Sequence, residues 1–133
     1  MKNFLLNILV LSKKEPGLVK NMLMMTDDAA MRLELLVDFG KKLLPVPDGA
    51  DCTEILGCAS FVQICRLGNN FYGVADSAIV RGIVAIIIAM VDGKSADEIK
   101  KMDVNSEFQS LGLGLGAGRL NGVNSMIRFL QNL

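Results

Sequence analysis

The stretch TEILGCASFVQICRLGNNFYGVA, residues 53–75, decides the fold. It contains three apolar, strand-like runs: 53–56, 60–67 and 71–75. Gly-Asn-Asn at 68–70 separates the last two runs, and because Gly and Asn tolerate positive φ it predicts a hairpin turn. The stretch therefore predicts a small antiparallel sheet, with Gly57 and Cys58 at the break between the first two strands.

On both sides of this stretch, apolar residues recur with the spacing of a helix rather than with that of a strand. Apolar residues over 79–88 cover nearly every side of a helix, which predicts a buried helix, and Asp76 can cap it. SADE at 95–98 is a capping box that opens another helix. Further helices are expected at 2–12, 18–25, 27–44 (with Thr26 and Asp27 as caps) and from about 119 to 133. We expect one α+β domain over 1–133, with residues 1–27 as an N-terminal helical extension.

Composition excludes several kinds of function. The 133 residues carry 14 basic and 14 acidic side chains and no histidine. A formal net charge of zero disfavours nucleic acid as the main partner. Without histidine there is no Ser-His-Asp triad, no Cys-His pair and no His-ligated zinc. The chemistry must come from thiols, carboxylates, Lys, Arg or backbone groups.

The sequence also predicts the compartment. Three cysteines do not make a disulfide framework, and their odd number fits a reducing compartment. The apolar start of the chain lacks the small-residue cleavage site of a signal peptide. Residues 79–91 are too few to span a bilayer and include Arg81. We therefore expect a cytoplasmic protein with no membrane partner.

GLGLGAGRLNG at 112–122 has the pattern G-x-G-x-x-A through Gly112, Gly114 and Ala117. A dinucleotide-binding turn needs a buried strand before it, whereas the preceding residues are polar and helical in character. No Walker lysine is present either. A flexible connector into the last helix is the favoured interpretation, ahead of nucleotide binding.

The three cysteines differ in their surroundings. Cys65 lies mid-strand among apolar residues, where a free cysteine acts as a small hydrophobe. Cys52 follows a loop and could resolve an oxidised Cys58. Cys58 follows a glycine at a turn, where another molecule could approach it. A zinc site made of these cysteines and Asp51 stays open, although no C-x-x-C pair supports it.

Four segments in order resemble the SufE/CsdE-type sulfur acceptors of iron–sulfur cluster assembly. They are GCAS at 57–60, ADSAIVRGIVAI at 75–86, LGAGRLNGVNSMI at 115–127 and an upstream run with Arg32, Gly40, Lys41, Leu44, Pro45 and Pro47. The resemblance covers roughly 28–133 and implies an α+β fold similar to the IscU-type scaffolds.

The resemblance implies a function as well. Members of this family partner a PLP-dependent cysteine desulfurase, accept its persulfide sulfur on a loop cysteine and pass it to the cluster-assembly machinery. The family motifs place that cysteine at Cys58, an acidic residue at Asp76 and an arginine at Arg119. Thiol exchange of this kind needs neither a metal nor a cofactor of its own. Arg119 could favour the Cys58 thiolate, or form a surface ion pair; Asp76 could be only a helix cap.

The sequence departs from the family pattern around the site. Ala59, Phe61 and Gln63 replace two Gln and a Trp, and Gly116–Gly118 replace Thr-Pro-Ser. These changes leave the identity of the partner open but keep the thiol. Two other functions therefore remain possible: a non-catalytic binding module that regulates a desulfurase or scaffold, and a metal- or cluster-binding scaffold of the same fold.

Overall fold

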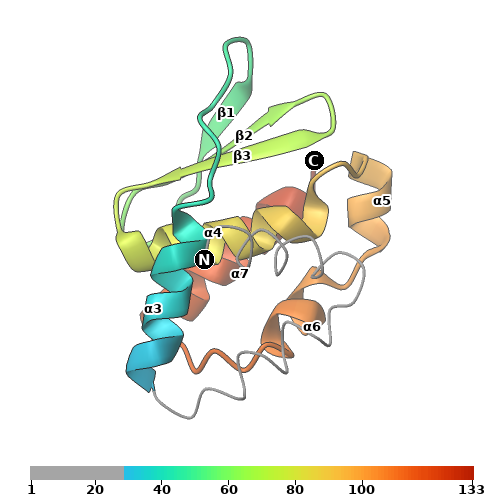
Figure 1. Ribbon diagram of the computed structural model, residues 1–133. Helices are drawn as coiled ribbons and strands as arrows, with labels where there is room; N and C mark the ends of the chain where they lie inside the picture. Colours follow the sequence, from blue (N-terminus) through green and yellow to red (C-terminus); the bar gives the residue numbers. More distant parts are fainter. Residues whose placement is uncertain (1–28) are drawn as a thin grey trace.

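The computed structural model describes residues 29–133, and the helices expected at 2–12 and 18–25, with the caps Thr26 and Asp27, lie outside them. In the described part, a three-stranded antiparallel sheet forms one layer and helices form the other (Figure 1). The expectation of an α+β fold with a small antiparallel sheet is confirmed.

The sheet has the order β1-β2-β3, made of Asp51–Glu54, Val62–Leu67 and Asn70–Ala75. β2 and β3 form the predicted hairpin, and its turn uses Gly68 at φ 62°. Alternate residues of these two strands, such as Ile64 and Phe71, are buried against the helical layer. The strands therefore follow the two-residue period expected of a sheet with one covered face.

The first strand does not lie where the apolar pattern places it. We expected a strand at 53–56, whereas β1 covers Asp51–Glu54, all four residues of which are exposed. Ile55 is buried and its N–H still donates to the Val62 carbonyl at 2.8 Å, but the chain then turns at Leu56 and Gly57. Pairing with β2, rather than side-chain apolarity, fixes the limits of this edge strand.

Helix α4, Ala78–Val91, forms the centre of the core, as its all-round apolar pattern predicts. Ten of its residues are buried. Its N-cap is Ser77, whose hydroxyl accepts from the Val80 N–H at 3.4 Å, so the prediction that Asp76 caps this helix is wrong. Ser77 takes this place because its side chain stands three residues before the N–H that it satisfies.

Helix α3, Ala29–Gly40, crosses α4 at very close range. A Cβ added to Gly82 of α4 would overlap the carbonyl oxygen of Leu36 on α3. A Cβ added to Gly40 would come within 2.7 Å of the Arg81 Cβ. Because backbone meets backbone here, the two helices need glycine at both positions.

Three more helices complete the helical layer: α5 at Ala96–Lys101, α6 at Val104–Gln109 and α7 at Ala117–Gln131. The capping box at Ser95 and Glu98 is present as predicted. Gln131 of α7 donates to the carbonyl oxygens of Ile99 and Met102, which joins the last helix to α5. No helix within 29–133 is long and apolar enough to cross a membrane.

Candidate functional site

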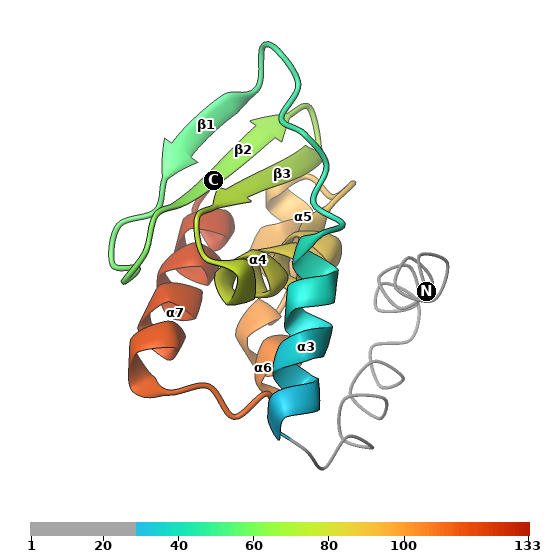
Figure 2. The ribbon, with the colours of Figure 1, turned by 60° about the vertical axis from the view of Figure 1, so that its left-hand side comes forward.

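The loop between β1 and β2, residues 55–61, lies beside helix α7 (Figure 2). Gly57 has φ 91°, which favours glycine, as expected for a tight turn at this point. A Cβ on Gly57 would also come within 2.6 Å of the Ser125 Oγ on α7. The turn therefore favours glycine just before the cysteine, and a side chain there would also displace the Ser125 hydroxyl.

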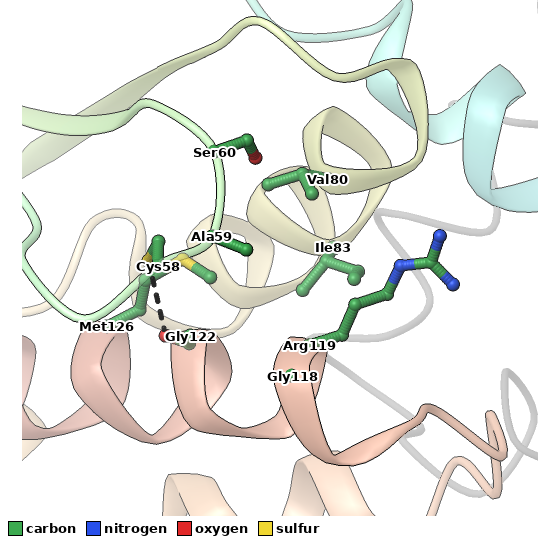
Figure 3. Close-up of a pocket in the computed structure, with 9 residues that line it drawn as sticks. All are labelled: Cys58, Ala59, Ser60, Val80, Ile83, Gly118, Arg119, Gly122 and Met126. Carbon is green, nitrogen blue, oxygen red and sulfur yellow. Dashed lines mark hydrogen bonds between the residues drawn. The ribbon is translucent and has the colours of Figure 1, made fainter.

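Cys58 follows in this loop and is partly buried against α7. Its Sγ donates to the Gly122 carbonyl oxygen at 3.8 Å (Figure 3). A Cβ on Gly122 would come within 3.2 Å of that Sγ, so the missing side chain of Gly122 makes room for the thiol. Sequence reasoning had not singled out Gly122, because its role depends on a contact between residues 64 positions apart.

A small cavity of about 30 Å³ lies beside the thiol. Val80 and Ile83 of α4 and Met126 of α7 contribute apolar side chains to its wall, as Figure 3 shows. A space of this volume accommodates a group the size of a water molecule. The cavity therefore adjoins Cys58 but cannot hold a larger substrate.

Burial raises the pKa of the Cys58 thiol above its ordinary value. The neutral thiol is thus favoured in this arrangement, and the thiolate becomes populated only at higher pH. Opening of the loop or a nearby cation would lower this pKa and so favour a nucleophilic role for Cys58.

The two supporting residues suggested by the resemblance occupy different places. Arg119 lines the cavity beside Cys58, but its side chain is exposed and its guanidinium points away from the thiol (Figure 3). Asp76 is exposed just before the start of α4, and it is not among the residues that line the cavity. The structure therefore places only the aliphatic part of the Arg119 side chain near Cys58, and it does not bring Asp76 to the thiol.

The other two cysteines are bonded to each other, which differs from the expectation of free thiols. Cys52 and Cys65 form a disulfide, so Cys65 is not a free buried thiol and Cys52 is paired with it rather than placed to resolve Cys58. The two residues lie directly opposite each other in the β1–β2 register. The disulfide could not be predicted without this register, because sequence spacing does not show which residues of two paired strands face each other.

The disulfide also argues against a zinc site made of the three cysteines and Asp51. It occupies two of the three sulfur atoms that such a site would use, and residues 29–133 contain no cluster of three His, Cys, Asp or Glu able to hold a metal ion. The glycine-rich segment likewise follows helix α6 rather than a strand, so the context of a dinucleotide-binding turn does not occur there.

The fold and the site define a small α+β protein that presents one free cysteine on a hairpin loop, packed against the last helix. Residues 18–133 match the model of the SufE family, described as an Fe-S metabolism associated domain. The chain belongs to this family, and the resemblance seen in the sequence is confirmed.

Known proteins similar to the chain agree with this assignment. An uncharacterized SufE-like protein of Rhizobium meliloti (strain 1021) is 34% identical over 118 residues, covering 80% of this chain and 84% of its own. The sulfur acceptor protein CsdE of Escherichia coli (strain K12) is 34% identical over 100 residues, covering 68% of each chain. The cysteine desulfuration protein SufE of Wigglesworthia glossinidia brevipalpis is 30% identical over 105 residues, covering 72% of this chain and 73% of its own.

A solved structure shares the fold. The solution structure of a hypothetical protein from Thermus thermophilus matches with a TM-score of 0.65 over 86% of this chain and 90% of that one. Its sequence is 18% identical, so this likeness concerns the fold alone.

Proposed function

We propose that this protein is a sulfur acceptor that takes persulfide sulfur from a PLP-dependent cysteine desulfurase onto Cys58 and thereby stimulates the desulfurase. The observation that carries the proposal is the free thiol of Cys58 at the tip of a hairpin loop, beside a cavity of about 30 Å³. The names of the relatives from Escherichia coli and Wigglesworthia support it.

The reaction is a thiol exchange in which all atoms are accounted for. The Cys58 thiolate attacks the outer sulfur of the persulfide on the desulfurase, a new S–S bond forms, and the desulfurase cysteine leaves as a thiolate. The proton of the Cys58 thiol passes to solvent or to the leaving thiolate. A second exchange hands the outer sulfur to a downstream acceptor, for which we propose an iron–sulfur assembly scaffold.

The raised pKa of Cys58 supports a role for the docked desulfurase in activating the thiol. Because burial raises the pKa of the Cys58 thiol, we propose that docking draws the loop away from Gly122, or brings a cation to it, before the attack. Leu56 and Phe61 flank the cysteine and are 78% and 40% exposed, which gives the loop an apolar rim that a partner can cover. Arg119 is the proposed cation for the persulfide anion once the loop has moved; for Asp76, which does not line the cavity, we propose no direct contact with the thiol.

The partial burial of Cys58 also fits a second function, regulation without sulfur transfer. A protein of this fold could dock on the desulfurase and regulate it without carrying sulfur, since Cys58 is partly buried and its burial raises the pKa of the thiol. Stimulation that survives Cys58→Ser would favour this regulatory function. We propose the cytoplasm as the compartment, where the Cys58 thiol stays available and the Cys52–Cys65 disulfide is open to reduction.

The test is the mass of the intact protein after incubation with a cysteine desulfurase and L-cysteine, followed by peptide mapping. We expect one additional sulfur atom on Cys58, removable by a reductant. Cys58→Ser should take up none and lose the stimulation, whereas Cys52→Ser, which removes an exposed cysteine of the same hairpin, should still take up sulfur. Uptake by Cys58→Ser, or none by the unaltered protein although it binds the desulfurase, would contradict the proposal.

A further inference from the structure

The disulfide of the β1–β2 hairpin encloses the candidate site. Cys52 and Cys65 are separated by 13 positions, and Cys58 lies close to the middle of the loop that they close. The register pairs them directly, with their Cα atoms 4.0 Å apart. Any change in this bond therefore acts on the segment that carries the free thiol.

Strand β1 has little else to hold it. All four of its residues are exposed, and it is one of the two edge strands of the sheet, so it buries no side chain of its own in the core. Within residues 29–133, the ladder to β2 and the disulfide both attach this strand to the sheet. Segments with few buried apolar contacts open locally at low free-energy cost, so we expect this strand to open more easily without the covalent tie.

The two cysteines of the disulfide differ in exposure. Cys52 lies on the exposed edge strand, whereas Cys65 is fully buried. An external thiol can therefore approach the disulfide from the side of Cys52, and Cys65 is the sulfur that leaves. This asymmetry suits reversible exchange, with one sulfur that solution reagents can approach and one protected by the fold.

We propose that Cys52 and Cys65 are a reversible thiol–disulfide exchange site that controls the Cys58 loop. The disulfide form holds β1 on β2 and keeps Cys58 against Gly122; the dithiol form lets β1 and the loop move away, so that Cys58 becomes accessible. This inference rests on the proposed function only where it concerns sulfur uptake.

The exchange transfers two electrons. On reduction, the thiolate of a small thiol attacks the Cys52 sulfur, the Cys52–Cys65 bond breaks and Cys65 leaves and takes up a proton. A second molecule of the small thiol then displaces Cys52 and forms the small-molecule disulfide. Oxidation by that small-molecule disulfide runs through the same steps in reverse.

The first experiment measures how fast Cys58 reacts with iodoacetamide, with peptide mapping to assign the label. The protein is equilibrated with oxidised or with reduced glutathione and then freed of it. We expect labelling of Cys58 to be several-fold slower in the oxidised protein than in the reduced one. Cys52→Ser should react at the faster rate after either treatment, and Thr53→Ser, the matched control on the same strand, should behave like the unaltered protein.

A second variant guards against a new pairing between Cys58 and Cys65. Cys52→Ser/Cys65→Ala leaves Cys58 as the only thiol and should also be labelled at the faster rate after both treatments. Equal labelling of Cys58 in the oxidised unaltered protein and in this double variant would overturn the inference.

The second experiment separates this inference from the proposed function. A desulfurase loaded with persulfide and freed of L-cysteine is mixed with the oxidised or the reduced protein. Slower sulfur uptake by the oxidised form supports control of the loop, and equal uptake contradicts it. If neither form takes up sulfur while the labelling rates still differ, the control of Cys58 access stands and the sulfur-acceptor function fails.

Discussion

At the scale of single residues, two glycines decide how Cys58 is held. Gly57 allows the backbone to turn toward α7, and Gly122 leaves the space into which the thiol fits. The thiol is consequently partly buried, and burial raises its pKa. The position of the thiol in this structure therefore depends on two neighbours that carry no side chain.

Gly122→Ala tests this arrangement. The new Cβ would come within 3.2 Å of the Cys58 Sγ, so the thiol should be displaced toward solvent and should react faster with iodoacetamide. Gly118→Ala is the matched control, since a Cβ there meets nothing within 4 Å. That control should keep the original labelling rate and gain up to about 1 kcal/mol of stability from helix propensity. Equal labelling rates in the two variants would show that Gly122 does not hold the thiol in place.

At the scale of elements, the crossing of α3 and α4 sets the position of the core helix. The crossing depends on Gly82, where the two backbones touch. Helix α4 then supports the sheet on its other side, through residues such as Val84 against Gly73 of β3. A change in the distance between the helices would reach the sheet and the loop that it carries.

Gly82→Ala should destabilise the protein strongly. The added methyl group would overlap the Leu36 carbonyl oxygen, and because this is backbone the strain cannot be relieved by a side-chain movement. Overpacking of this kind costs about 1–3 kcal/mol or more. Urea denaturation followed by circular dichroism measures the loss. A urea midpoint equal to that of Gly118→Ala would mean that α3 and α4 move apart to admit the methyl group without loss of stability.

At the scale of the whole molecule, one disulfide joins the edge strand to a sheet whose remaining stability comes from burial. The core extends from α3 through the sheet to α7, and it does not include β1. The disulfide therefore adds to stability mainly by restricting the unfolded chain, which fluctuates less when residues 52 and 65 are linked.

Reduction should lower the free energy of unfolding by about 3 kcal/mol, the value expected for a closed loop of this length. Urea denaturation with and without dithiothreitol gives the difference. Cys52→Ser should start at the lower stability and show no further change with the reductant. A reductant effect of equal size in Cys52→Ser would assign the loss to something other than this disulfide.

Much of the fold follows from local sequence patterns. The hairpin at Gly68, the buried helix α4 and the capping box at Ser95 were all predicted, because turn chemistry and hydrophobic period act within a few residues. The cap of α4 was assigned one residue too early, at Asp76. Two adjacent polar residues are equivalent in the pattern, and only the backbone geometry distinguishes them.

The sequence by itself determined the α+β class, the family and the position of the candidate cysteine, since motifs in fixed order carry that information. The tertiary structure alone decided what surrounds the cysteine. It paired Cys52 with Cys65, placed Gly122 beneath Cys58 and turned the guanidinium of Arg119 away. Each of these depends on residues far apart in the chain, whose meeting is set by strand register and helix packing rather than by local preference.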